Sequence, residues 1–249
     1  MKTHIQLKPS PEHARVIVCG SPERARLVSE FLTGSRQVAQ NREYHSYLGT
    51  YANHSVLVAS HGVGSAGAAI CFQELIDAGA QAIIRIGTAG GLADSARISD
   101  IVLPVGAVRK DGASTLMVPP QYPALPDFDL TSSLHLCLEK KGIAHRRGIV
   151  LTSDLFYPGP LGNDLDFFKS IGVLAVEMEC STLFVIGLLR GVRTGALLVL
   201  DGNPLKWSEG QYDPDPNRLR DSLEKCIEAA LSSLIQVPLS ATAEGRRPT

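Results

Sequence analysis

Short apolar runs alternate with amphipathic stretches along most of this chain, and no other feature constrains its fold as strongly. The apolar runs have the length of β-strands and lie at 15–19, 55–60, 82–86, 101–108, 148–152, 173–176 and 196–200. The amphipathic stretches have the length of helices and lie at 22–32, 65–78, 130–141, 164–170, 180–190 and 216–235. Because this alternation is typical of α/β proteins, we predict one three-layer αβα domain with a central mixed β-sheet, spanning residues 1–237.

Charge and composition exclude several classes of function. The 249 residues suffice for a large buried core, and 44% of them are apolar and 20% charged, as in ordinary globular proteins. The formal net charge is −1, so no basic surplus predicts a nucleic-acid or membrane partner. Any anion must therefore be bound by a local group of arginines.

The cysteines and the first residues predict the compartment, and the loop composition predicts mobile segments. Residues 1–8 lack the apolar core of a signal peptide, and the five cysteines form no C-x-x-C pair. We expect a reduced, cytoplasmic protein whose small, polar residues 238–249 form a disordered tail. Residues 117–129 and 201–216 are rich in proline or glycine, and loops of this length are often functional lids.

Three turns follow directly after predicted strands, at 19–24, 85–90 and 200–204. Ligands of open α/β sheets bind beyond the carboxyl ends of the strands, so we expect these turns to meet at one site. A glycine in such a turn lets a backbone N–H approach an anion, and the N-terminus of a following helix adds partial positive charge.

Two arginines indicate that the ligand is an anion. Arg24 lies in the first turn of a predicted helix, where a cation opposes the helix dipole, so it is either an anion ligand or a solvated surface residue. Arg85 lies inside the apolar run 82–86, where a strand is buried on both faces. A buried arginine needs a partner, which is either a structural carboxylate or a bound phosphate.

Two carboxylates, Glu177 and Glu179, follow another predicted strand. Their two-residue spacing places both on the same side of an extended chain. Carboxylates accept hydrogen bonds from sugar hydroxyls, but a stabilising charge at the N-terminus of the next helix explains these residues equally well.

One glycine pattern resembles a dinucleotide-binding motif without fulfilling it. Residues 62–67 read G-V-G-S-A-G, follow a predicted strand and open a predicted helix. The motif also requires a carboxylate about 20 residues later, and residues 84–88 contain none. We therefore expect no NAD site and assign the glycines to close helix–strand packing. The seven histidines form no H-x-x-x-H pair, so we expect no metal site either.

Eight segments, taken in order, resemble the nucleoside phosphorylase-I family of purine nucleoside and uridine phosphorylases. The likeness runs from His4 to about Ile235 and is greatest to purine nucleoside phosphorylases of the malaria-parasite type. The segments are G-S-P-E-R at 20–24, N-R-E-Y at 41–44, S-H-G-V-G-S-A-G at 60–67, R-I-G-T-A-G at 85–90, V-R-K-D-G at 108–112, S-D-L-F-Y-P at 153–158, V-E-M-E at 176–179 and D-G-N-P-L-K-W at 201–207.

This resemblance implies roles for individual residues. The phosphate ligands would be Gly20, Arg24, Arg85, Thr88 and, from a neighbouring subunit, Arg42. The ribose ligands would be Met178, Glu179 and, from the neighbour, His4. The base would contact Ala89, Tyr157, Val176 and Trp207, and Asp201 would be the general acid at the purine N7. The chain departs from the family at Ser21, where aspartate is usual, and at Thr88, where purine enzymes more often have serine and uridine phosphorylases have threonine.

The resemblance also implies a phosphorylase/hydrolase-like fold and phosphorolysis of purine nucleosides, of the inosine or guanosine type, to a free base and ribose 1-phosphate. It implies no metal and no organic cofactor, since inorganic phosphate is a co-substrate. The expected partners are the nucleoside, phosphate and further copies of the chain, in at least a dimer and by family likeness a hexamer.

Other functions remain open at this point. A uridine phosphorylase would read uracil with a glutamine and an arginine where this chain has Pro160 and Gly162. A 5′-methylthioadenosine phosphorylase or nucleosidase is a further alternative, although a nucleosidase would not need three phosphate-binding arginines. A non-catalytic nucleoside-binding protein would not need both Asp201 and Glu179. The sequence does not rank inosine, guanosine, adenosine and 5′-methylthioadenosine.

Overall fold

The computed structural model describes residues 2–209 and 216–239, without the side chains of residues 207–209, 216 and 218. Its strands are β1 (Arg15–Cys19), β2 (Thr33–Asn41), β3 (Tyr44–Tyr51), β4 (His54–Ser60), β5 (Ala82–Gly91), β6 (Ile101–Lys110), β7 (Arg146–Ser153), β8 (Ala175–Glu177) and β9 (Arg193–Gly202). Its α-helices are α1 (Pro22–Ser29), α2 (Ser65–Asp77), α3 (Gly112–Met117), α4 (Phe128–Lys140), α5 (Leu165–Ser170), α6 (Cys180–Arg190) and α7 (Pro216–Gln236). Short 3-10 helices lie at η1 (Pro11–His13) and η2 (Pro204–Glu209). Residues 240–249 of the predicted tail at 238–249, and residues 210–215 of the predicted lid at 201–216, lie outside the described residues.

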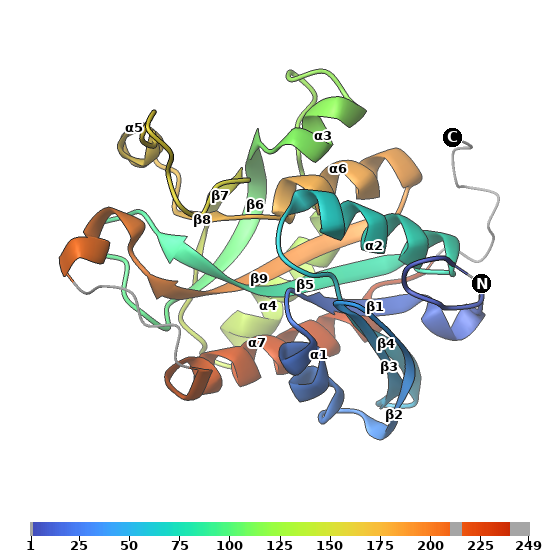
Figure 1. Cartoon of the computed structure of the whole chain (residues 1–249). Coiled ribbons are helices and arrows are strands. Elements are labelled where there is room, and N and C mark those ends of the chain that lie inside the picture. The colour runs from blue at the N-terminus through green and yellow to red at the C-terminus, as the bar shows by residue number, and fades with distance from the viewer. Residues whose placement is uncertain (1, 210–215, 240–249) are drawn as a thin grey trace.

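All the described strands belong to one mixed sheet in the order β2-β3-β4-β1-β5-β8-β7-β6-β9 (Figure 1). Strand β5 is its centre, because it pairs in parallel with β1 and β9 and in antiparallel sense with β8. Strand β9 also pairs with β6. A closed ring of strands therefore forms from β5, β8, β7, β6 and β9. Residues at the ends of these strands line one cavity.

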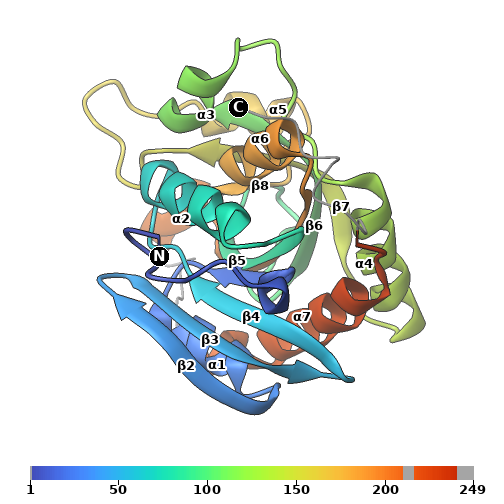
Figure 2. The ribbon, with the colours of Figure 1, turned by 90° about the vertical axis from the view of Figure 1, so that its right-hand side faces the viewer.

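Helices cover the sheet on both faces and make three layers (Figures 1 and 2). Helices α2 and α6 lie over one face, and α1, α4 and α7 lie over the other. Side chains of β1 alternate between the two cores: Val16 and Val18 pack with α2 and α6, whereas Ile17 and Cys19 pack with α1 and α7. This period of two, with apolar residues on both sides, is what a sheet buried on both faces requires. The predicted αβα architecture with a mixed sheet is confirmed.

Most elements match the sequence prediction, and the differences lie in β2, β3, α3 and the length of β5. Strands β2 and β3 and helix α3 were not predicted. Strand β5 continues past the apolar run to Gly91, so the predicted glycine-rich turn at 85–90 is part of the strand. None of the described helices is long and apolar enough to cross a membrane.

Candidate active site

A cavity of about 600 Å³ lies where β1, β5, β8 and β9 end. All three predicted turns contribute to its wall, through Gly20, Thr88 and Asp201 among others. Cavities of this size hold small organic ligands. The expectation that the three turns meet at one site is therefore confirmed, because the parallel strands β1, β5 and β9 deliver their carboxyl ends to the same edge.

Arg24 reaches this cavity from the first turn of α1. The helix begins there because Ser21 Oγ accepts a hydrogen bond from the Arg24 backbone N–H at 3.2 Å and Pro22 occupies the first helical position. Ser21, the departure from the family pattern, thus serves as the helix cap. No described residue forms a hydrogen bond or ion pair with the Arg24 guanidinium, and burial lowers its pKa. Arg24 is therefore a half-buried cation that an anion would stabilise.

Arg85 has carboxylate partners within the chain. Its side chain is buried, and its Nη2 lies 2.5 Å from Glu179 Oε2 and 3.2 Å from Glu177 Oε2. Burial alone would lower the pKa of Arg85, but the two carboxylates outweigh it and raise this pKa. The structural-carboxylate interpretation of Arg85 is correct, and the residue still lines the cavity.

Glu177 and Glu179 share Arg85 but bind different backbone groups. Glu177 accepts N–H bonds from Glu179 and Cys180 at the start of α6, each at 2.9 Å, and the Thr152 hydroxyl at 2.5 Å. Glu179 Oε1 accepts the Gly64 N–H at 2.6 Å. The helix-terminus prediction is confirmed for Glu177, which accepts N–H groups at the start of α6. Glu177 and Glu179 both line the cavity, and their role toward sugar hydroxyls stays a prediction. Burial, together with the charge of Glu177, raises the pKa of Glu179.

The glycine pattern at 62–67 positions a backbone donor. Gly62 and Gly64 have φ of 77° and 92°, values that residues with a side chain rarely adopt. No heavy atom lies within 4 Å of the place where a Gly64 Cβ would be, so close packing is not the reason for this glycine. Its left-handed backbone instead directs the N–H to Glu179, which corrects the packing interpretation for Gly64.

His61 and Gly87 confine the Arg85 guanidinium, and sequence reasoning missed both. His61 is fully buried, and its Nε2 lies 3.5 Å from Arg85 Nη1. Burial, and then the charge of Arg85, lowers the pKa of His61 well below its ordinary value, so this imidazole is neutral. A Cβ at Gly87 would lie 2.4 Å from Arg85 Nη1. The signal for Gly87 was its position two residues after Arg85, on the same side of β5.

Asp201 lies at the end of β9 and lines the cavity. Burial raises its pKa, while a hydrogen bond with Thr88 and the charge of Arg24 act in the opposite direction. A carboxyl with a raised pKa is suited to donating a proton. Thr88, Ala89, Val176 and Met178 line the same cavity.

Most residues of the segment 153–165 also line the cavity, and Lys110 and Asp164 form an ion pair there. Phe156 and Pro158 line the cavity. Tyr157, between them, is 78% exposed and packs edge-on against Phe156, so it does not reach the cavity wall.

Two other predicted site residues, His4 and Arg42, are not part of this wall, and a third, Trp207, cannot be placed relative to it from the described residues. His4 is bound to Glu74, with Nδ1 2.8 Å from Oε1. Arg42 is exposed in the turn between β2 and β3, with φ of 54°. Trp207 lies in η2, and its side chain lies outside the described residues.

Residues 14–236 match the family model of the phosphorylase superfamily. The chain belongs to this superfamily. It is 40% identical over 238 residues to the purine nucleoside phosphorylase of Plasmodium vivax, with 92% of this chain and 97% of the relative covered. It is 34% identical over 236 residues to the uridine phosphorylase of Treponema pallidum, with 91% and 92% covered.

A solved structure agrees with these relatives. The purine nucleoside phosphorylase of Toxoplasma gondii in complex with immucillin-H superposes with a TM-score of 0.90 at 29% identity, covering 95% of this chain and 96% of that one. The chain therefore belongs to the nucleoside phosphorylases, a family whose enzymes act on a nucleoside and phosphate.

Proposed function

We propose that the enzyme cleaves purine nucleosides of the inosine or guanosine type with inorganic phosphate, and releases the free base and ribose 1-phosphate. The observation that carries this proposal is Asp201, a cavity carboxyl whose pKa is raised by burial. A purine leaves as a poor anion unless N7 receives a proton, and general acid catalysis contributes roughly 10²–10⁴ in rate. The higher identity to a purine enzyme than to a uridine enzyme supports the same choice.

Phosphate is proposed to lie between Gly20, Arg24 and Thr88. The Arg24 guanidinium has no other partner among the described residues, and the N-terminus of α1 adds partial positive charge. Arg85 lines the same cavity and adds positive charge there, part of which Glu177 and Glu179 neutralise. The arginines would orient the nucleophile and neutralise its charge as it attacks the sugar.

The ribose is proposed to lie beside Met178 and Glu179. Glu179 already accepts one backbone N–H and the Arg85 guanidinium, which fixes its carboxylate. A fixed carboxylate is a good acceptor for sugar hydroxyls, because little conformational freedom is lost on binding. Ala89 and Val176 would contact the base. This chemistry requires no metal or organic cofactor.

A panel of nucleosides tests the proposal. Inosine or guanosine should be cleaved only with phosphate, and ribose 1-phosphate should be the sugar product. Adenosine, uridine and 5′-methylthioadenosine are assayed in parallel, with and without phosphate. A preference for uridine would refute the purine assignment, and equal rates without phosphate, with free ribose as product, would refute phosphorolysis.

A further inference from the structure

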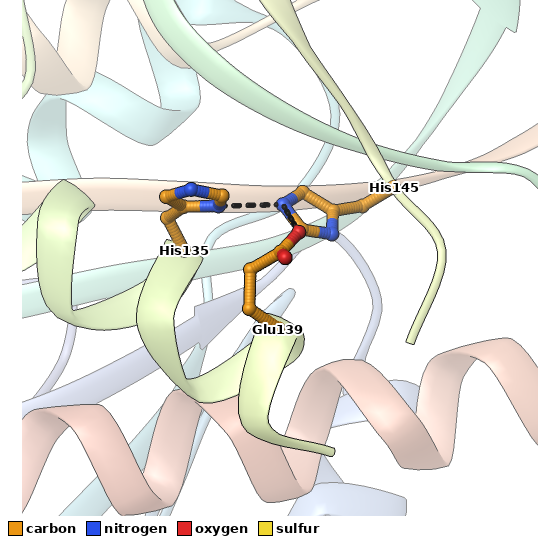
Figure 3. A group of neighbouring side chains, drawn as sticks. All are labelled: His135, Glu139 and His145. Atoms are coloured by element: carbon orange, nitrogen blue, oxygen red, sulfur yellow. Dashed lines mark hydrogen bonds and ion pairs between the residues drawn. The ribbon is translucent and has the colours of Figure 1, made fainter. Parts of the chain in front are cut away.

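Two histidines and a glutamate form a cluster of potential metal ligands outside the active site (Figure 3). One ligand atom each from His135, Glu139 and His145 lie within 4.8 Å of one another. No other cluster of this kind occurs in the described part of the chain. None of the three residues lines the active-site cavity.

The fold brings these residues together through one helix and one tight turn. His135 and Glu139 are four residues apart on α4, so they lie on the same face of the helix. Gly142, with φ of 66°, then reverses the chain, and the Ile143 N–H bonds back to the Leu138 carbonyl at 2.9 Å. This turn returns His145 to the side of the helix.

Hydrogen bonds assign the tautomer of His145. Its Nδ1 lies 2.9 Å from the Ile143 carbonyl oxygen, which only accepts, so Nδ1 carries the hydrogen. The lone pair of Nε2 therefore points toward His135 Nδ1, 2.9 Å away. An imidazole that donates one ring N–H to a backbone carbonyl and offers the other nitrogen is the usual arrangement of a metal-binding histidine.

The exposure of His145 and Glu139 also suits a metal. The His145 side chain is only 2% exposed, whereas that of Glu139 is 62% exposed and free to adjust. Glu139 Oε1 lies 4.0 Å from His145 Nε2 and supplies a negative charge that a bound cation would neutralise.

We propose that His135 Nδ1, His145 Nε2 and a Glu139 carboxylate oxygen bind Zn²⁺, with water as the fourth ligand. Tetrahedral zinc with bonds of about 2.0–2.1 Å places its ligand atoms about 3.3 Å apart, so the two imidazoles need to separate by only a few tenths of an ångström. His135 shifts its hydrogen from Nδ1 to Nε2 and stays neutral. The ion would join α4 to the chain segment that leads into β7.

Zinc titration of the whole, chelator-treated protein tests this site. Zinc displaced from a chromophoric chelator should bind with one equivalent per chain and a micromolar or lower dissociation constant. His135→Ala and Glu139→Gln should each weaken binding by more than the roughly 10–100-fold loss that follows when a group behind a metal ligand is removed. His54→Ala removes a histidine outside the cluster and should leave zinc affinity unchanged.

Two further measurements separate a metal site from a purely structural histidine pair. Co²⁺ should give the visible absorption of a tetrahedral complex in the parent protein and not in His135→Ala. Excess zinc should raise the melting temperature by about 5 °C in the parent and much less in Glu139→Gln, a surface change expected to fold normally. Absence of a stoichiometric site, or zinc affinity unchanged in both cluster variants, would overturn the proposal.

Discussion

The guanidinium of Arg85 has little room to move. Two carboxylates bind it on one side, His61 lies 3.5 Å away on the other, and Gly87 leaves just enough space beneath it. Glu179, the carboxylate proposed to hold the ribose, accepts hydrogen bonds from both Arg85 and the Gly64 N–H. Any displacement of Arg85 therefore disturbs Glu179 as well. The position of the Arg85 guanidinium thus depends on the absence of a side chain at Gly87.

Gly87→Ala should therefore lower kcat/KM strongly while the protein still folds. The added Cβ would lie 2.4 Å from Nη1 and 2.7 Å from Cζ of Arg85, so at least one charge-assisted hydrogen bond must break. Such a bond contributes about 1.5–3 kcal/mol, which predicts a loss of roughly 10–100-fold. Gly106→Ala on β6 is the matched control, because its Cβ would meet nothing closer than 3.5 Å. Wild-type kinetics in Gly87→Ala would contradict this account.

Asp201→Asn should remove the proposed proton donor without changing the shape of the cavity. We expect kcat on inosine or guanosine to fall by at least about 10²-fold with little change in KM, because the lost interaction belongs to the transition state. The loss should be far smaller with 7-methylguanosine, whose purine carries a positive charge before it leaves. An equal loss on both substrates would indicate that Asp201 acts in some other way.

At the scale of elements, the polar connection between α3 and α6 is notable because it is buried beside an apolar core. Asp111 caps α3 by accepting the Ser114 N–H at 2.6 Å, and it also accepts the hydroxyls of Ser181 and Thr182 in α6. Burial alone would raise the pKa of Asp111, but these hydrogen bonds outweigh it and hold the pKa below its ordinary value. The fold therefore favours the charged form.

Asp111→Asn should destabilise the protein in a way that depends on pH. The stabilisation from a lowered pKa is complete above the unfolded-state value of about 3.9 and is lost as the pH falls through the folded-state value. Urea unfolding at pH 7 should show a deficit of about 2 kcal/mol or more, and this deficit should shrink below pH ~4. Asp166→Asn, an exposed change on α5, is the control. A deficit independent of pH would show that the charge of Asp111 does not matter.

Burial on both faces of the sheet decides which strands could be predicted from the sequence. Strands β1, β4, β5 and β9 are continuous apolar runs and were found, whereas β2 is mostly exposed and has no such run. Every second residue of β3 is buried from Tyr44 to Leu48, but one of these is Ser46, and three of the eight residues of the strand are tyrosines, so the sequence shows no apolar alternation. Helix α3 is short, and its cap at Asp111 was the one available signal.

The same reasoning explains the sites. Residues at strand ends, such as Arg24, Thr88 and Asp201, could be placed together because parallel strands share an edge. The partners of Arg85 required the register of β5 and β8, which sequence does not specify. The histidine cluster escaped a search for H-x-x-x-H because its helical pair is His135 and Glu139, and the third member follows a turn.

At the scale of the whole molecule, two residues that the family resemblance predicts for the site lie away from the cavity of their own chain. Arg42 is exposed at the turn of the β2–β3 hairpin, and β2 is the edge of the sheet. His4 is held by Glu74, which also accepts the backbone N–H groups of His4 and Ile5. A twofold dimer would present both residues to the partner's cavity and complete two equivalent sites. We therefore propose that the active unit is at least a dimer.

Mixing two inactive variants tests whether the site is shared. Arg42→Ala and Arg24→Ala should each be nearly inactive alone, because every site then lacks one arginine. After co-refolding in equal amounts, about half of the dimers are mixed, and one of the two sites in each mixed dimer has both arginines, so activity should recover to about a quarter of wild type. The two variants mixed without unfolding, and each refolded alone, are the controls and should stay inactive. Failure to recover activity, once mass spectrometry has established that the dimers are mixed, would mean that both arginines act within one chain and that the dimer is not needed to complete the site.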